Sequence, residues 1–397
     1  MNKDIKKILI VLTLYALAGG IFYSFQELWL AENHLSVKTI GIVMSLCSLL
    51  SVSVIFLCSN IIKEKHLKKF LKILILLKIL LLLLLYVLNN TGLNVLIKFF
   101  TMFDYVVDVE LYAVIYPLIT VIEKNDKVYA LRSILYDAGY YIGIFFTVVM
   151  LGKMIFNIEV TYNTYCIIGA FILIIAYIIL IRIDMSKYPI KENNDKNVIA
   201  DLNKRLKSDK ISKVYLSYIL TNQISYYSIN GLVLTVLVST LSFSAKAASN
   251  FNLIIGLASV FVASIILAKL TFKNDYVNII IKLGGRLVLY ILACLLPFKW
   301  VLLITIIYVR LLASAYQNIT DAPYVNRFDS QEQLAFYNIK EMTSYLGRSI
   351  GTGICGLTLT IGIRYNFLAA AIFNLIALVL SIYATKLRRK DIKINDR

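Results

Sequence analysis

Residues 96–122 form the run LIKFFTMFDYVVDVELYAVIYPLITVI, which is long and apolar enough to cross a bilayer yet contains Asp104, Asp108 and Glu110. A carboxylate at bilayer depth costs about 2.5–3.5 kcal/mol on insertion scales, so it normally faces a water-filled cavity or a partner charge. Asp104 and Asp108 have i, i+4 spacing and share one helix face, whereas Glu110 points to another side. The run therefore predicts a membrane helix with one acidic face.

The composition extends this prediction to the whole chain. Hydrophobic residues make up 59% and charged residues 16% of the 397 residues, whereas soluble domains average about 45–50% and 25%. The apolar runs are continuous rather than alternating, which excludes a transmembrane β-barrel. Since a span needs about 20 apolar residues, the fold class is predicted to be an all-α membrane protein with 12 transmembrane helices. These helices are expected at residues 8–30, 37–59, 70–88, 95–121, 130–151, 162–182, 212–238, 247–271, 277–296, 299–320, 333–360 and 363–385.

The distribution of Lys and Arg predicts the orientation. Alternate connections hold 31 of the 41 cations, with the region 269–286 and the tail from Lys386 counted among them, and the opposite connections hold 6. Because Lys and Arg favour cytoplasmic loops, both termini are expected in the cytoplasm and the chain is expected to be multi-pass in the plasma (inner) membrane. Because the Lys and Arg residues lie in the predicted cytoplasmic connections, membrane topology accounts for the net charge of +18. No nucleic-acid partner is therefore expected.

One long polar stretch divides the chain. Residues 1–182 and 212–397 are each expected to form a six-helix bundle, the second with a short basic tail. Residues 183–211 are interpreted as a cytoplasmic linker, a plain solvated tether, with a regulatory or lipid-binding role as the alternative.

An internal repeat is indicated by a shift of 204 residues. This shift places Gly143 on Gly347 and Asp137 on Glu341, and so equates the fifth expected helix with the eleventh. Repeats of this length are found in secondary transporters.

The loop after the second expected helix, residues 60–69 (NIIKEKHLKK), resembles a signature of the major facilitator superfamily of secondary transporters, Gly-x-x-x-Asp-Arg-x-Gly-Arg-Lys. Glu64 stands for the Asp, Lys65 for the Arg, and Lys68 and Lys69 for the basic pair, while both glycines are replaced. Two six-helix halves, cytoplasmic termini and a basic central linker also look like this superfamily over essentially the whole chain. The resemblance implies a gating role for the four charged residues of this loop.

Glycines at i, i+4 spacing mark the fifth and eleventh expected helices. The fifth contains Gly139-x-x-x-Gly143, part of the antiporter signature of the superfamily without its Gly-Pro, and the eleventh contains Gly347, Gly351 and Gly353. Close packing of helices through small residues is the simpler interpretation, and it is compatible with halves that move during transport.

The resemblance also implies that helices 1, 4, 7 and 10 line a central cavity. Asp104 and Asp108 on helix 4 would then face Arg310 on helix 10, which the 204 shift places between them on Val106. In a low-dielectric cavity, desolvation and a like-charged neighbour raise the pKa of a carboxylic acid, so one of the two aspartates is a candidate proton carrier. A fixed salt bridge between the halves is the alternative.

Polar residues of helix 7 complete the candidate site. Asn222, Tyr226 and Asn230 recur at i, i+4, i+8 and predict a hydrogen-bonding stripe that faces the cavity, or else holds neighbouring helices together. Tyr105 and Tyr308 are further candidates for contact with an amphipathic substrate.

Other in-membrane charges are assigned structural or coupling roles by sequence. These residues are Asp137, Lys340, Glu341 and Arg348.

The function expected from the resemblance is secondary active transport of a small amphipathic molecule by alternating access, coupled to protons, with export slightly favoured. A lipid or lipid-linked flippase on the same fold and a non-transporting membrane receptor or assembly partner are the alternatives. No Gly-x-x-x-x-Gly-Lys nucleotide loop is present, and the protein is not expected to be an enzyme. Five scattered Cys and two His lack metal-site spacing, so no metal and no cofactor beyond the proton are expected. The expected partners are the substrate and the lipid bilayer, with a monomer as the functional unit.

Overall fold

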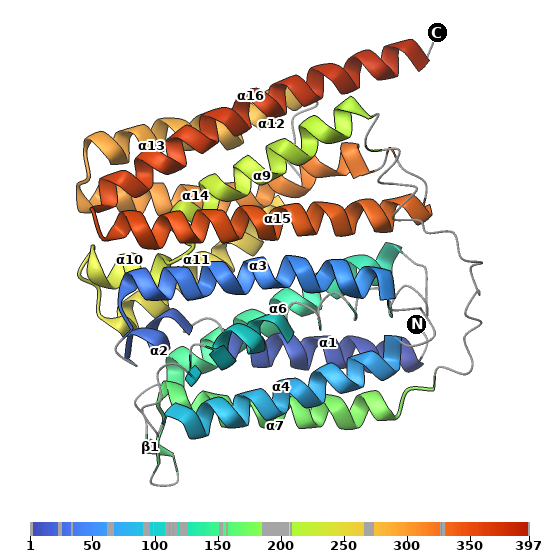
Figure 1. Cartoon of the computed structure of the whole chain (residues 1–397), viewed down its shortest axis with the longest axis vertical. Helices are drawn as coiled ribbons and strands as arrows, with labels where there is room; N and C mark the ends of the chain where they lie inside the picture. Colours follow the sequence, from blue (N-terminus) through green and yellow to red (C-terminus); the bar gives the residue numbers. More distant parts are fainter. Residues whose placement is uncertain are drawn as a thin grey trace. The chain divides into compact units, whose positions relative to one another are not determined.

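The chain is almost entirely helical in a computed structural model (Figure 1). Contacts divide it into two compact units. Unit 1 comprises Met1–Ser36, Ser53–Asn193 and Phe243–Leu253, and unit 2 comprises Val37–Val52, Asn194–Ser242 and Ile254–Arg397. The structure describes residues 3–22, 26–32, 35–61, 67–89, 96–97, 99–107, 111, 114, 118, 126–150, 154–155, 158–184, 206, 209–265, 274–325, 327 and 330–395.

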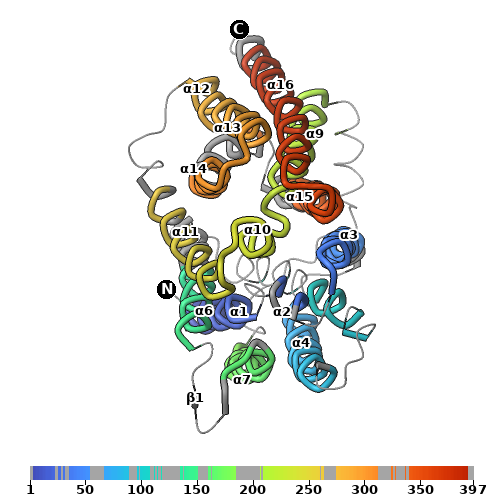
Figure 2. Tube along the Cα trace, turned by 90° about the vertical axis from the view of Figure 1, so that its left-hand side faces the viewer, coloured from blue at the N-terminus to red at the C-terminus, as the bar shows by residue number. Residues whose placement is uncertain are grey.

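Unit 1 is built around its first helix, α1, which packs against α6 and α7, while α4 packs against α7 (Figure 2). A short antiparallel hairpin of β1 and β2 precedes α7. The elements are α1 (Lys3–Phe22), α2 (Gln26–Glu32), α4 (Leu67–Asn89), α6 (Asp126–Met150), β1 (Met154–Ile155), β2 (Ile158–Glu159) and α7 (Tyr162–Ile181).

Unit 2 has an equivalent centre in α9, which packs against α15 and α16, while α13 packs against α16 and α14. Its elements are α9 (Lys210–Asn230), α10 (Val233–Ser239), α12 (Asp275–Ile279), the π-helical segment η5 (Ile280–Gly284), α13 (Gly285–Leu295), α14 (Lys299–Val325), α15 (Ser330–Leu359) and α16 (Ile363–Asn395). Two helices, α3 (Val37–Ile61) and α11 (Ala245–Ile265), contribute residues to both units.

The helices carry the apolar surface that a membrane requires. Within the described part of the chain, five helices are long and apolar enough to span a bilayer. Large apolar side chains such as Phe171, Phe261 and Trp300 are exposed on the protein surface, as expected where lipid rather than water is the solvent. The five helical stretches are Lys3–Phe22, Leu67–Leu88, Asn163–Ile181, Asp275–Leu295 and Ile363–Asp391.

Glycines allow α1 and α6 to approach closely. A Cβ on Gly139 would lie 2.5 Å from the carbonyl oxygen of Thr13, and one on Gly143 would lie 2.4 Å from that of Leu17. Real Cβ atoms do not come so near to backbone atoms, so only glycine fits at these two positions. The expected close packing through Gly139 and Gly143 is confirmed.

Glycine contacts agree with the internal repeat that the sequence indicates. A Cβ on Gly347 would lie 2.7 Å from the carbonyl oxygen of Leu220 in α9. Gly347 therefore allows close packing of α15 on α9, as Gly143 allows close packing of α6 on α1. Equivalent glycines therefore form equivalent helix contacts in the two units.

Two helix predictions are corrected by the structure. The expected helix 212–238 is divided between α9 and α10 at Gly231 and Leu232. Within the expected helix 8–30, the described residues belong to α1 up to Phe22 and to α2 from Gln26, and residues 23–25 lie outside the described part. The expected basic tail from Lys386 is helical, since α16 continues to Asn395; its charges follow an apolar stretch without a helix-breaking residue.

Two cations counted with the predicted cytoplasmic connections lie inside the expected helix 277–296. Lys282 lies in η5 and Arg286 in α13, and both are 1% exposed. Removing these two cations from the 31 assigned to the predicted cytoplasmic side leaves 29 against 6, so the predicted orientation is unchanged. The count of connection cations was wrong here because the region 269–286 overlaps that helix.

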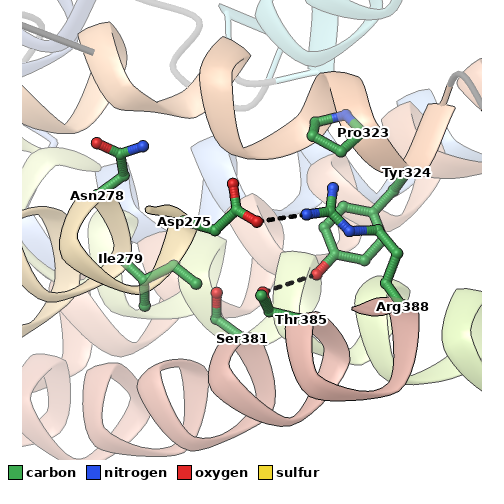
Figure 3. Close-up of a pocket in the computed structure, with 8 residues that line it drawn as sticks. All are labelled: Asp275, Asn278, Ile279, Pro323, Tyr324, Ser381, Thr385 and Arg388. Atoms are coloured by element: carbon green, nitrogen blue, oxygen red, sulfur yellow. Dashed lines mark hydrogen bonds and ion pairs between the residues drawn. The ribbon is translucent and has the colours of Figure 1, made fainter. Parts of the chain in front are cut away.

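The end of α16 is tied to the start of α12 by ion pairs (Figure 3). Arg388 lies 2.6 Å from the carboxylate of Asp275, and Arg389 lies 3.3 Å from the same oxygen. The hydroxyls of Tyr324 and Thr385 are 3.1 Å apart beside this pair. A small pocket is lined by Asp275, Asn278, Ile279, Pro323, Tyr324, Ser381, Thr385 and Arg388.

Asp209 begins α9 as its N-cap and accepts a hydrogen bond from the amide of Ile211 at 3.0 Å. It also accepts one from the hydroxyl of Ser212 and pairs with Arg327 at 3.2 Å. Burial alone would raise the pKa of this carboxyl, but the Ser212 hydrogen bond and the Arg327 charge outweigh burial and hold the pKa below its usual value.

A pH-dependent contribution to stability follows from this depressed pKa. A carboxylate whose pKa is lowered by folding stabilises the native state above its unfolded pKa of about 3.9. This stabilisation is lost as the pH falls through the lower, folded value. Since Arg327→Gln removes one cause of the depression, wild type should melt above this variant at pH 7, and the difference in melting temperature should narrow toward pH 3. The exposed Arg364→Gln is the control, and a difference for Arg327→Gln that stays constant with pH would contradict the assignment.

Candidate functional site

A buried ion pair lies inside unit 1 between Lys78 of α4 and Asp104, which belongs to the helical residues 99–107. The Lys78 Nζ is 2.9 Å from the Asp104 Oδ2 and 3.4 Å from the main-chain oxygen of Asp104. Lys78 is 3% exposed and Asp104 is 0% exposed. The sequence predicted that this carboxylate would face water or a charge, and the charge that the structure provides is Lys78.

Lys78 and Asp104 depend on each other, because burying either charge without the other would cost free energy. Lys78 lies near the middle of the candidate span Leu67–Leu88, where an isolated charge is most costly. Each ion compensates the buried charge of the other, so removal of either leaves a lone charge in the protein interior. Because Asp104 is held in this way, its capacity to take up a proton depends on Lys78.

A second buried charge, Arg286 of α13, lies in unit 2. It donates hydrogen bonds from Nη1 to the Asn222 Oδ1 at 2.9 Å and from Nη2 to the Ser225 Oγ at 3.1 Å. The Nη2 also donates to the hydroxyl of Tyr290 at 3.3 Å. All three partners are neutral, and the Nε–H of Arg286 is buried without an acceptor among the described residues.

Tyrosine rings surround this guanidinium. The central carbon of Arg286 lies 5.6 Å from the ring centre of Tyr290 and 6.0 Å from that of Tyr226. The rings of Tyr226 and Tyr227 pack edge to face, with their centres 5.1 Å apart. The central guanidinium carbon of Arg348 lies 5.0 Å from the ring centre of Tyr227. Such distances permit cation–π attraction, so this part of α9 attracts positive charge through aromatic faces.

Arg310, predicted to lie at the cavity, is half-buried on α14. Two expected stripe residues, Asn222 and Tyr226, lie beside Arg286. Asn230 donates to the main-chain oxygen of Tyr226 at 3.2 Å, a contact within its own helix.

The π-helical segment η5 precedes Arg286 and contains Lys282. The Lys282 Nζ donates to the hydroxyl of Tyr218 at 2.9 Å. Tyr308, predicted as a substrate contact, donates its hydroxyl to the main-chain oxygen of Ile281 at 2.6 Å. A Cβ on Gly285 would lie 2.0 Å from that hydroxyl, so glycine makes room for Tyr308. In the structure Tyr308 therefore stabilises the π-helical turn.

The remaining charges assigned by sequence occupy separate places. Lys340 and Glu341 pair with each other at 3.5 Å. Lys69 is exposed, whereas Lys68 donates to the main-chain oxygens of Ile183 and Ile181 at the end of α7. Lys68 thus interacts with a helix C-terminus, where cations are favourable.

Tyr105 is buried at 5% exposure. Several predicted residues lie outside the described part of the chain and stay predictions. These are Asp108, Glu64, Lys65 and the side chain of Asp137.

Sequence reasoning missed the buried cations that the structure places at the site, namely Lys78, Lys282 and Arg286. Lys78 lies inside the expected helix 70–88, but its pairing with Asp104 across 26 residues of chain has no local signal. For Arg286 a signal existed, because Asn222 and Ser225 on the polar helix 7 require a buried partner. Across the described residues, no three His, Cys, Asp or Glu side chains gather as metal ligands would.

Solved transporter structures share this fold. The nucleoside transporter NupG is 13% identical, with 97% of this chain and 99% of that chain covered at a TM-score of 0.71. A bacterial homologue of the human lysosomal transporter Spinster, inward-facing and unoccupied, is 12% identical, with coverage of 98% and 99% and a TM-score of 0.69. A D-xylose–proton symporter is 10% identical, with coverage of 96% and 95% and a TM-score of 0.65.

Neither a protein-family model nor a curated protein sequence matches the chain. Identities this low establish the fold alone. The predicted fold class, an all-α integral membrane protein with the major facilitator superfamily architecture of two pseudo-symmetric helical bundles, is confirmed.

Proposed function

We propose that the chain is a secondary active transporter that moves a small amphipathic molecule across the membrane by alternating access. The observation that carries this proposal is the placement of fully buried charges, Lys78 with Asp104 and Arg286 alone, midway along apolar helices of a transporter fold. Intramembrane charges are costly and mark substrate or ion pathways. Movement of the two halves about such groups would couple binding to access from each side.

Proton coupling is assigned to the acidic face of the fourth expected helix. Protonation of Asp104 would leave the ammonium of Lys78 buried without its counter-charge, which disfavours Asp104 as the carrier. The second acid of this face, Asp108, is therefore the proposed proton carrier. No other cofactor takes part in the proposed cycle.

Export is the favoured direction of transport. The corrected count of Lys and Arg, 29 in one set of connections against 6 in the other, supports cytoplasmic termini and a cytoplasmic linker. The membrane is proposed to be the plasma membrane. The proposed working unit is a monomer in the bilayer, with the substrate as its partner and no nucleic acid.

Transport is tested with everted membrane vesicles and purified protein. Uridine, D-xylose, benzoate and benzylammonium are first ranked by the rise in melting temperature that each produces. The best stabiliser, radiolabelled, should accumulate in everted vesicles with an acidic interior and not when the pH gradient is collapsed. Asp108→Asn should abolish this accumulation while leaving exchange of labelled for unlabelled compound intact.

Two outcomes would contradict the proposal at different levels. Undiminished gradient-driven accumulation by Asp108→Asn would exclude Asp108 as the proton carrier. A compound that binds the purified protein but neither accumulates nor exchanges would favour a receptor or assembly partner. Movement of a fluorescent phospholipid between leaflets of proteoliposomes, with no flux of the small compounds, would favour a flippase.

A further inference from the structure

Among the described residues, no negatively charged group contacts the guanidinium of Arg286. A guanidinium stays protonated in proteins, and this one is 1% exposed. Its hydrogen-bond partners are the amide oxygen of Asn222 and the hydroxyls of Ser225 and Tyr290, none of which carries negative charge. Buried charges in proteins are normally paired with an opposite charge, so the place of a counter-ion remains to be filled.

The guanidinium also has hydrogen-bonding capacity to spare. An arginine side chain has five N–H donors, and three acceptors contact that of Arg286. The Nε–H is buried without a described acceptor. A carboxylate or phosphate binds to such donors in a planar, two-point geometry that neutral groups do not match.

The 204 shift relates two pairs of positions in the repeats, because it places Lys78 on Lys282 and Asp104 on Tyr308. Lys282 is a buried cation, as Lys78 is, and it donates to the hydroxyl of Tyr218 at 2.9 Å. Tyr308 replaces the acid, and its hydroxyl is bonded to the main-chain oxygen of Ile281. Arg286 lies four residues beyond Lys282 and is therefore a further buried cation of the second repeat.

Aromatic groups define what else a bound molecule would contact. The rings of Tyr226 and Tyr290 lie 6.0 and 5.6 Å from the guanidinium carbon. Tyr226 is half-buried, whereas Arg286 and Tyr290 are 1% and 0% exposed. Of the two rings beside the guanidinium, Tyr226 is therefore the one that reaches the surface of unit 2.

From these contacts we propose that the transported molecule is an organic oxyanion, a carboxylate or phosphate on an aromatic or apolar body, whose negative group binds Arg286. This inference rests on the proposed function and names its substrate class. The anionic oxygen accepts from the free Nε–H, and the apolar body packs against Tyr226 and Tyr290. The bound anion supplies the counter-charge that Arg286 lacks among the described residues.

Binding to the purified full-length protein in detergent tests the proposal with four probes built on one ring. Benzoate and phenyl phosphate are anionic, benzamide is neutral and benzylammonium is cationic, so shape is held nearly constant while charge changes. Wild type should bind at least one anion at least tenfold more tightly than benzamide, as measured by the shift in melting temperature with concentration. Comparison of benzoate with phenyl phosphate identifies the anionic group.

Arg286→Gln should remove the preference for anions, and the exposed Arg364→Gln should keep it. If Arg286→Gln does not fold, Arg286→Lys is the second variant, because it keeps the charge but loses the planar fork. Arg286→Lys should weaken the better anion several-fold and leave benzamide unchanged. Equal binding of benzoate, phenyl phosphate and benzamide by wild type, or an anion preference that survives these Arg286 substitutions unaltered, would overturn the inference.

The inference and the proposed function fail separately. Gradient-driven transport of neutral compounds, with no preference for anions, would contradict the proposed anion site but agree with the proposed transport function. An Arg286-dependent anion preference without flux of any bound compound would keep the anion site and overturn transport.

Discussion

Asp104→Asn should lower the free energy of unfolding by about 3–5 kcal/mol, because it leaves the ammonium of Lys78 buried without a counter-charge. The pair is 2.9 Å apart, and its side chains are 4% and 0% exposed, so water cannot replace the missing partner. Lys78→Met should be comparably destabilising, since it leaves the Asp104 carboxylate in the same position. These are the largest effects expected for single charge-removing substitutions in the described part of unit 1.

The double variant Lys78→Met, Asp104→Leu separates the charge effect from packing. Replacing a buried ion pair with apolar groups of similar volume is often neutral or stabilising, so the double variant should recover most of the lost stability. Unfolding in mixed micelles of increasing sodium dodecyl sulfate measures all three variants. Glu341→Gln, which breaks a half-exposed pair, should cost no more than about 1 kcal/mol. Additive losses in the double variant would show that the two residues do not act as a pair.

Gly143→Ala should be strongly destabilising although it adds a single methyl group. The new Cβ would lie 2.4 Å from the carbonyl oxygen of Leu17 and 2.9 Å from the amide nitrogen of Ile21, both backbone atoms of α1. A helix backbone cannot rotate aside as a side chain can, so α1 and α6 must separate, and overpacking of this kind costs about 1–3 kcal/mol or more. The expected result is a lower melting temperature and a lower yield of folded protein.

Gly169→Ala is the matched control on α7, because the new Cβ would lie 3.4 Å from the side chain of Leu82 and 4.0 Å from the carbonyl oxygen of Ala18, both ordinary contacts. Alanine is favoured over glycine within a helix by about 0.8–1.0 kcal/mol, so this variant should be neutral or slightly more stable. Equal losses for Gly143→Ala and Gly169→Ala would contradict the close α1–α6 contact.

Hydropathy predicted the helices well because lipid requires long apolar runs. It failed at the junction of α9 and α10 around Gly231 and Leu232. The polar residues before this junction, Ser228 and Asn230, were interpreted as part of the polar face of one continuous helix. Asn230 followed by Gly231 was the local indication of an interruption.

The candidate site was only partly predictable, because charge pairing depends on contacts between distant segments. Asp104 and Asn222 were found from their unusual polarity in apolar helices. Their partners, Lys78 and Arg286, lie 26 and 64 residues away in the chain. Spacing along one helix predicts a shared face, but it does not show which neighbouring helix contacts that face.

The π-helical turn at Ile280–Gly284 has a consequence for how this sequence can change by mutation. A π-helical turn contains one residue more than an α-helical turn, and each residue advances the helix by about 100°. Deletion of a single codon here would turn Arg286 and every later side chain of α13 by about that angle, away from Asn222 and Ser225 on α9. The residue would still be arginine, but it would contact a different neighbouring helix. Insertion or deletion here, as well as substitution, therefore changes which side chains contact this buried charge.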